Sequence, residues 1–165
     1  MIALARVDER LVHGQVLVGW VPHLSARRVV VADDEAAASP LARAAMTMAL
    51  PPGVEADVLP IAGVDWGGLS RSPEPVLVVL RGVSEAERAL AAGLTPARTP
   101  VLNLGNLHYG QGRRQVTPSV FLTAAELDSL RRLGAAGFRV EARAVPLDAP
   151  VELAEIERRW ATAGG

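Results

Sequence analysis

Short runs of apolar, β-branched residues recur along the chain, and amphipathic stretches separate them. The clearest run is VLVVL at Val76–Leu80, where no polar residue interrupts the hydrophobic ones. Such an unbroken run is typical of a strand buried on both faces, as in a parallel sheet. The pattern predicts strands at Ile2–Val7, Val29–Ala32, Val54–Leu59, Val76–Leu80, Val101–Leu104, Ser119–Leu122 and Phe138–Val145.

Helical patterns fill the intervals between these strands. The first runs from Gly14 to about Leu24, and Pro22 should end or kink it. Two sequences, SEAE from Ser84 and TAAE from Thr123, have the spacing of a capping box that opens a helix. Glycines should end these two helices. The first of them should end at Gly93 and the second at Gly134 or Gly137. The other predicted helices are Pro40–Leu50 and Val151–Trp160.

Regular alternation of strands and helices with short connections indicates an α/β fold. We expect a single domain over residues 1–165, with an open, doubly wound, mainly parallel sheet and helices on both faces. Sheets of this kind bind their ligands at the carboxyl ends of the strands. We therefore expect a ligand site in the loops Asp8–His13, Asp33–Ser39, Arg81–Ser84 and Gly105–Arg114.

Composition narrows the chemistry. The 165 residues carry 17 basic and 18 acidic side chains, a net charge of −1, which argues against nucleic acid as a partner. No run of apolar residues reaches the ~18 that a membrane span needs, so we expect no direct membrane insertion. The chain has no cysteine, which excludes disulfides, thiolate nucleophiles and cysteine-bound zinc. All its basic residues are arginine, so no lysine is available for Schiff-base chemistry or a phosphate loop.

The loop after the first predicted strand concentrates charge and a histidine. His13 should lie at or just before a helix N-terminus, and Gly14 lets the backbone come close to a ligand. Free N–H groups and the helix dipole favour an anion there. A neutral imidazole beside a phosphoryl-sized site is a nucleophile, so phosphohistidine chemistry is physically sensible. The residues alone also allow His13 to cap the helix or to pack beneath the loop.

Neighbouring polar residues have supporting roles in this interpretation. Arg6, within the strand, is expected to serve the structure, and Asp8 could orient the imidazole or anchor an arginine. In the glycine-rich segment after the fifth strand, Asn103 or His108 could form a wall of the His13 site, and His108 could be a second phosphoryl acceptor. The same segment could equally be a plain turn. No spacing of His and Glu resembles a metal site.

The Asp33-Asp34 pair follows the second strand and could be mistaken for a magnesium site. We expect instead that one aspartate caps the next helix and the other is exposed.

Four separated segments resemble one protein family. RVDERLVHGQV, followed by Trp20, resembles the opening of IIB subunits of the mannose/fructose/sorbose family of the bacterial phosphoenolpyruvate-dependent sugar phosphotransferase system (PTS). VVVADDEAAASPLARAAMTMALPPGV, VLNLGNLHYGQGRR and GFRVEARAVPLDAPVEL resemble later segments of the family in the same order. The resemblance therefore covers nearly the whole chain.

The resemblance implies a phosphocarrier without metal or organic cofactor. His13 would be phosphorylated at Nδ1 by a histidine of a IIA protein or domain, and would pass the group to a sugar held by membrane IIC and IID proteins. Asp8 and Arg10 match the family's Asp-x-Arg-Leu-x-His-Gly-Gln motif, which makes them candidate catalytic residues. The activity implied is that of a phosphohistidine–sugar phosphotransferase, cytoplasmic and peripherally associated with a sugar permease. The resemblance also suggests a homodimer, which no pattern in the chain dictates.

Physical requirements fit that role. Transfer between imidazoles needs in-line placement and compensation of charge on the phosphoryl oxygens. Arg10 and the backbone N–H groups of Gly14 and Gln15 could supply both, so we expect an exposed His13 ring beside a positive pocket. Two alternatives stay open at this point: a phosphorylatable regulator not coupled to transport, and a domain that binds an anion or nucleotide without turnover.

Overall fold

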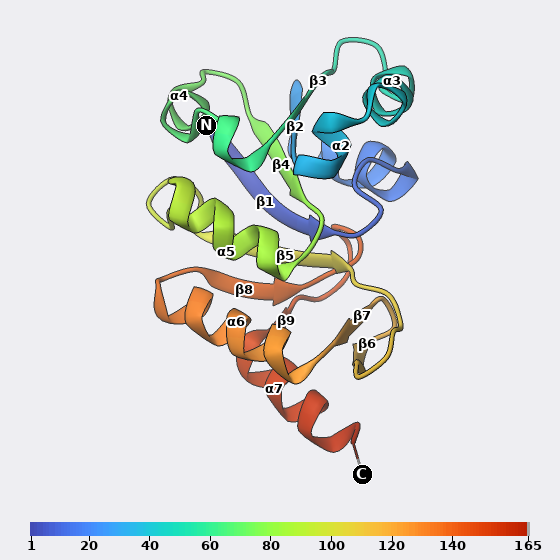
Figure 1. Ribbon diagram of the computed structural model, residues 1–165, viewed down its shortest axis with the longest axis vertical. Helices are drawn as coiled ribbons and strands as arrows, with labels where there is room; N and C mark the ends of the chain where they lie inside the picture. Colours follow the sequence, from blue (N-terminus) through green and yellow to red (C-terminus); the bar gives the residue numbers. More distant parts are fainter. Residues whose placement is uncertain (165) are drawn as a thin grey trace.

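The computed structural model describes residues 1–164, and Gly165, the last residue of the expected domain, lies outside them. Its central sheet consists of β1 (Ile2–Asp8), β2 (Arg28–Ala32), β3 (Glu55–Leu59), β4 (Val76–Leu80), β5 (Val101–Asn106), β8 (Arg139–Ala142) and β9 (Val151–Glu152). Their order across the sheet is β3-β2-β4-β1-β5-β8-β9 (Figure 1). Neighbours from β3 to β8 are parallel, and β9 pairs with β8 in the antiparallel sense.

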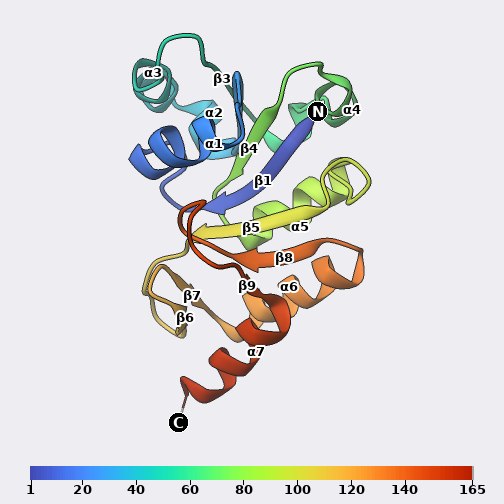
Figure 2. The same ribbon diagram turned by 180° about the vertical axis from the view of Figure 1, so that it is seen from behind.

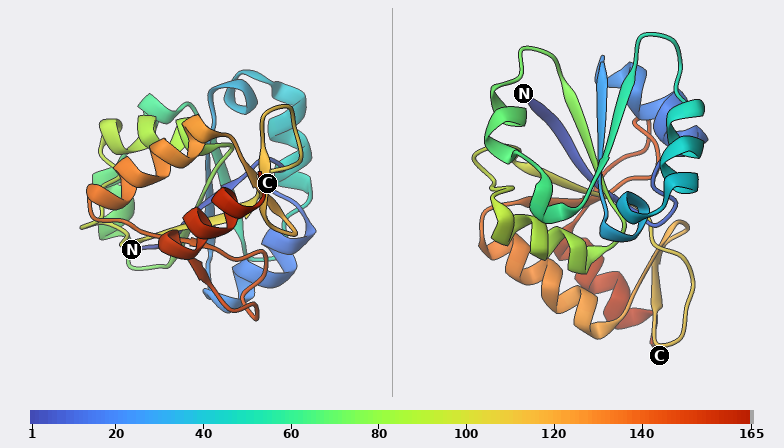
Figure 3. Two further views of the ribbon diagram at one scale, coloured as in Figure 1. Left: turned by 90° about the horizontal axis from the view of Figure 1, so that it is seen from below. Right: turned by 45° about the horizontal axis from the view of Figure 1, so that its top comes forward.

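Helices cover both faces of this sheet (Figures 2 and 3). One face carries η1 (Gln15–Trp20, a π-helical turn), α1 (Val21–His23), α2 (Asp34–Ala38) and α3 (Pro40–Met48). The other carries η2 (Ile61–Gly63), α4 (Trp66–Arg71), α5 (Val83–Ala92), α6 (Ala124–Ala135) and α7 (Leu153–Thr162). The predicted α/β fold with a doubly wound, mainly parallel sheet is confirmed.

Strand β4 shows why its sequence lacks polar alternation. Val76, Val78 and Leu80 belong to the core beneath α5 and α6, whereas Leu77 and Val79 belong to the core beneath η1 and α1. All five side chains are fully buried. A strand at the centre of a two-sided sheet thus requires apolar residues at every position.

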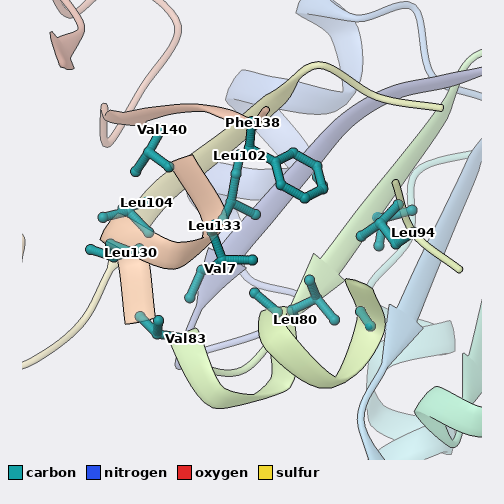
Figure 4. Packing of buried hydrophobic residues seen from close by; sticks show 14 of the residues in the cluster. Val7, Leu80, Val83, Leu94, Leu102, Leu104, Leu130, Leu133, Phe138 and Val140 are labelled. Carbon is teal, nitrogen blue, oxygen red and sulfur yellow. The ribbon is translucent and has the colours of Figure 1, made fainter. Parts of the chain in front are cut away.

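The larger core lies between the sheet and α5 and α6 (Figure 4). Val83 of α5 and Leu130 and Leu133 of α6 pack there with strand residues such as Val7 and Leu104. Burial of such side chains stabilises the fold by roughly 1.5–3 kcal/mol each. This packing fixes the positions of the strand ends from which the loops at the carboxyl edge of the sheet emerge.

The two predicted capping boxes have different outcomes. Thr123 and Glu126 form the expected reciprocal hydrogen bonds at the start of α6. The box predicted at Ser84 is wrong, because α5 begins one residue earlier, at Val83, and Gly82 precedes it without a side-chain cap. Val83 is 1% exposed, so its burial in the core accounts for the earlier start.

Two elements in the carboxyl-terminal half of the chain differ from the predictions. The strand expected at Ser119–Leu122 is β7 (Val120–Leu122), which pairs with β6 (Arg114–Thr117) in a separate hairpin instead of joining the main sheet. The helix expected from Val151 begins at Leu153, because Val151 and Glu152 first pair with β8.

Candidate active site

The loop between β1 and η1 lies at the centre of the sheet. Strand β1 is flanked by β4 and β5, and the chain leaves β1 and β4 toward opposite faces, into η1 and α5 respectively. Such a divergence opens a crevice at the carboxyl ends of the strands. The segment that follows β8 also curls past the ends of β1 and β5 (Figure 2). His13 precedes η1, whose N-terminus at Gly14 has no side-chain cap.

Asp8 connects the polar groups at this point. Its side chain is fully buried, and its Oδ2 atom lies 2.9 Å from Nε2 of His13. The same oxygen accepts hydrogen bonds from Nη2 of Arg6 at 2.8 Å and from Nδ2 of Asn106 at 2.8 Å. Its Oδ1 atom accepts the backbone N–H of Arg10 at 3.1 Å. The carboxylate therefore ties the strand, the loop and β5 to the histidine.

These contacts determine how the histidine is protonated. Burial works to raise the pKa of Asp8, but the hydrogen bond from His13, the charge of Arg6 and the hydrogen bond from Asn106 outweigh burial and lower this pKa below its ordinary value. Asp8 is then a carboxylate that can only accept, so the proton of the 2.9 Å contact belongs to Nε2 of His13. In the neutral ring, Nδ1 consequently carries the lone pair.

The structure corrects the expectation of an exposed imidazole. The side chain of His13 is only 7% exposed. Its Nδ1 atom is buried and has no hydrogen-bond partner among residues 1–164. Leaving a buried polar atom without a partner costs about 1–3 kcal/mol. This nitrogen is thus unpaired but screened from solvent.

Arg6 is locked in place from all sides. Its guanidinium donates to Oδ1 of Asn103 at 2.6 Å and to the carbonyl oxygens of Arg143 and Ala144, each at 3.1 Å. Burial lowers the pKa of Arg6, and the charge of Asp8 works against this effect. A Cβ atom on Gly105 would lie 2.0 Å from Cζ of Arg6, so glycine is required where the arginine crosses β5.

The other predicted site residues are dispersed. Arg10 is exposed, and its side chain lines a separate hollow of about 270 Å³. Gly14 is exposed, and Gln15 is half-buried, with its Oε1 atom accepting from Asn106. Asn103 supports Arg6 and does not contact His13. His108 is 53% exposed and its Nδ1 lies 3.0 Å from Glu9, so the structure does not bring it to His13.

Sequence reasoning missed Asn106. The predicted strand stops at Leu104, but β5 continues to Asn106, which is the register partner of Asp8 in the neighbouring strand. The asparagine is 7% exposed and donates to both Asp8 and Gln15. If the fifth predicted strand were extended to Asn106 and its carboxyl end aligned with that of β1, Asn106 would be expected beside Asp8.

The aspartates after β2 behave as expected. Asp33 caps α2 by accepting the N–H of Ala36 at 2.7 Å, while Asp34 is 46% exposed. Within residues 1–164, no three histidine, aspartate or glutamate side chains gather as a metal site would need. In the same part of the chain, no helix has the length and apolar character required to cross a membrane.

Known proteins have sequences similar to that of this chain. The chain is 28% identical over 158 residues to the PTS mannose-specific EIIAB component of Escherichia coli, covering 94% of this chain but only 48%, about half, of that protein. It is 31% identical to the N-acetylgalactosamine-specific phosphotransferase enzyme IIB component 2 of E. coli, covering 92% of this chain and 96% of the relative.

A solved structure of a IIB domain has the same fold as this chain. The IIB domain of the sorbose permease from Klebsiella pneumoniae superposes with a TM-score of 0.83 at 26% identity, covering 96% of this chain and 97% of that one. The family model described as "PTS system sorbose subfamily IIB component" matches residues 2–162. The chain therefore belongs to the sorbose subfamily of PTS IIB components.

Proposed function

We propose that His13 is the phosphoryl acceptor and donor of this IIB component. One observation carries the proposal: Nε2 of His13 lies 2.9 Å from the buried carboxylate of Asp8, a contact that assigns the ring proton to Nε2 and leaves the lone pair on Nδ1. Nucleophilic catalysis requires such an unprotonated, oriented atom. Its position before an uncapped helix N-terminus supplies a favourable place for the phosphoryl oxygens.

Each transfer is a simple displacement. The Nδ1 lone pair attacks the phosphorus of a IIA phosphohistidine, and the bond between phosphorus and the donor nitrogen breaks, returning its electrons to the donor ring. In the second transfer the oxygen of a sugar hydroxyl attacks the phosphorus, and the bond between phosphorus and Nδ1 of His13 breaks and returns its electron pair to Nδ1. The proton of the hydroxyl passes to water. Asp8 stabilises the positive charge that the Nε2-protonated ring carries while it is phosphorylated. Arg10, Gly14 and Gln15 are the proposed partners of the phosphoryl oxygens.

The buried Nδ1 adds a requirement. A phosphorus atom cannot bond to a nitrogen that even water cannot contact. The His13 ring or its loop must therefore shift when a donor docks. Leu11 within this loop has a φ of 53°, a conformation that non-glycine residues adopt at a cost. The strained loop is where we place this movement.

Partners follow from the family. The name of one relative combines EIIA and EIIB in a single component, which supports a IIA protein or domain as the donor. We propose membrane IIC and IID proteins with bound sugar as the acceptor side, and peripheral attachment of this chain to them. The names of the relatives specify mannose, N-acetylgalactosamine, fructose and sorbose, and the sugar of this chain lies within that class of chemistry.

Mapping the phosphorylated residue tests the proposal. The protein is mixed with a phosphorylated IIA partner, and the acid-labile phosphate is located by mass spectrometry at neutral pH. We expect label at His13 and its loss in His13→Ala, with His108→Ala as the matched control that keeps full labelling. Labelling of another residue, or unchanged labelling of His13→Ala, would refute the assignment.

A further inference from the structure

Glu9 ties the β1–η1 loop to the segment that follows β5. Its Oε2 atom accepts the backbone N–H of His108 at 2.9 Å, and its Oε1 atom accepts Nη1 of Arg113 at 2.5 Å. Its own backbone N–H donates to the carbonyl oxygen of Asn106 at 2.9 Å. Among residues 9–12, Glu9 alone forms side-chain hydrogen bonds or ion pairs within the described part of the chain. Its carboxylate is therefore the polar hold on this loop.

Arg113 uses its whole guanidinium to maintain that hold. Nη1 donates to Glu9 and also to the carbonyl oxygen of His108 at 2.8 Å, while Nε and Nη2 donate to the carboxylate of Glu126 at 3.1 and 2.6 Å. Glu126 is fixed in turn by its capping box with Thr123 at the start of α6. The side chain of Arg113 is only 17% exposed. The arginine thus connects the β1–η1 loop to a helix that packs on the core.

The contact between Glu9 and Arg113 is an ion pair. Burial works to lower the pKa of Arg113, but its hydrogen bonds with Glu126 and Glu9 outweigh burial and raise this pKa. The planar guanidinium bridges two carboxylates at once, which the single ammonium of a lysine does less well. The imidazole of His108 also lies 3.0 Å from Glu9, but it is 53% exposed and solvent screens it. We therefore assign the hold to Arg113 and to the backbone N–H.

Two features indicate that the β1–η1 loop is held against a tendency to move. Leu11 has a φ of 53°, which costs free energy in any residue other than glycine. Nδ1 of His13 is buried and unpaired, which is also unfavourable. A displaced loop would relax Leu11 and let water reach Nδ1. The packing of Leu11 beneath η1 and the ion pair of Glu9 oppose that displacement.

We propose that Arg113 is a positioning residue: by holding Glu9 it keeps the β1–η1 loop in the conformation that screens Nδ1 of His13. The proposal rests on the function proposed above, since the screening matters for transfer only if Nδ1 takes the phosphoryl group. The ion pair contacts neither His13 nor Asp8, so it acts through the backbone of the loop. Glu9 and Arg113 line a surface hollow of about 480 Å³, where a docked protein can reach them without entering the core.

Two measurements on the full chain test this role. Hydrogen exchange follows the backbone amides of Arg10 and Leu11, which Asp8 holds in the observed conformation. Phosphoramidate, a small donor that needs no docking surface, labels His13: Nδ1 attacks the phosphorus, and the bond to the protonated amine nitrogen breaks and releases ammonia. Glu9→Gln should raise both rates about tenfold, because a partly buried, charge-assisted hydrogen bond is lost.

Glu87→Gln is the matched control. Glu87 pairs with Arg132 at 2.8 Å and is 32% exposed, close to the 25% of Glu9, and its partners lie on α6. This variant should lose a comparable part of its unfolding free energy in urea while both rates stay at the wild-type value. Arg113→Gln should raise both rates as Glu9→Gln does. The double variant should be no faster than the faster single one, because the two residues act in one contact.

The outcomes separate this proposal from the phosphocarrier function. Unchanged exchange of the Arg10 and Leu11 amides in Glu9→Gln overturns the proposal, and so does an equal acceleration in Glu87→Gln. Additive acceleration in the double variant also overturns it, because Arg113 would then act on something other than Glu9. Failure of phosphorylated IIA to label His13 would refute the phosphocarrier function, and the exchange rates would still report whether the ion pair holds the loop.

Discussion

The Nε2 atom of His13 lies 2.9 Å from Oδ2 of the fully buried Asp8. Because contacts with His13, Arg6 and Asn106 lower the pKa of Asp8, the carboxylate stays ionised and acts only as an acceptor. This one contact assigns a proton to Nε2 and a lone pair to Nδ1. The orientation of the ring thus depends on Arg6 and Asp8 of β1 and on Asn106 of β5.

Replacing Asp8 by asparagine tests that dependence. An asparagine amide can donate to Nε2, which would favour the tautomer with hydrogen on Nδ1 and remove the nucleophile. We expect Asp8→Asn to slow phosphorylation of His13 by at least about a hundredfold. Quench-flow labelling measures the rate, and ¹⁵N chemical shifts of the ring report the tautomer. Asp57→Asn on β3, where Asp57 forms an exposed ion pair with Arg28 of β2, is the control expected to transfer normally.

Asn106 is predicted to act by positioning Asp8. Its amide nitrogen donates to Asp8 at 2.8 Å and to Gln15 at 3.1 Å. Asn106→Ala removes a hydrogen bond to a buried charge, so we expect a loss of about 1.5–3 kcal/mol in unfolding free energy. Transfer should slow as well, and the ¹⁵N chemical shifts of the His13 ring, which report its tautomer, should change. A variant that unfolds more easily but keeps the wild-type ring shifts and transfer rate would show a purely structural role.

The fold was largely predictable because its signals are local. The unbroken apolar run of β4 and the capping box of α6 each depend on a few consecutive residues. Short elements carry weaker signals: α4 contains Gly67 and Gly68, which disfavour helix, and β9 has only two residues. Their existence is decided by packing against the sheet, which sequence periodicity does not record.

The candidate site likewise contains contacts that local sequence predicts and contacts that it does not. Asp8 and His13 lie within one short loop, so their proximity follows from the sequence. Asn106 reaches Asp8 only through the register between β1 and β5, which no local pattern specifies. The burial of His13 also depends on tertiary packing. The charged residues of its loop had suggested an exposed ring instead. Local sequence therefore predicts the contact between Asp8 and His13 but not the residues that hold and cover this pair.

Gly105→Ala should disrupt the support of the site. The added methyl group would lie 2.0 Å from Cζ of Arg6, which is fixed by Asn103 and two carbonyl oxygens. Because a rigid buried guanidinium cannot move aside, we expect destabilisation of about 3 kcal/mol or more. Urea unfolding measures the change, with Gly14→Ala as the control, since a Cβ there meets no atom within 4 Å. Equal stability of the two variants would contradict the close packing at Arg6.

Leu11 allows strain and burial to be separated. Its φ of 53° favours glycine, yet its side chain is 2% exposed and packs in the core beneath η1. Leu11→Ala loses the buried side chain and keeps the strain, at a cost of about 2–5 kcal/mol. Leu11→Gly loses the same packing but relieves the strain, so we expect it to be about 1 kcal/mol more stable than the alanine variant. Thermal and urea unfolding of both variants measure the difference, and a less stable glycine variant would contradict strain at this position.

Acid should destabilise the fold through aspartates that are ionised in the native state. Burial favours a higher pKa for Asp33, but its hydrogen bonds with Arg81 and Ala36 prevail and lower this pKa, as contacts lower that of Asp8. A carboxyl group whose pKa is lower when folded stabilises the protein above its unfolded pKa, about 3.9. That contribution is lost as the pH falls through the folded pKa.

We therefore expect the unfolding free energy to be level from neutral pH down to about 4 and to decline below it. Asp33→Asn keeps an acceptor for the helix cap but loses the titrating charge beside Arg81. Its unfolding free energy, measured with urea at several pH values, should decline less steeply in acid than that of the wild type, although it is lower at neutral pH. Parallel curves for the two proteins would show that Asp33 has the same pKa in both states, because only a difference in proton uptake between them can change the slope.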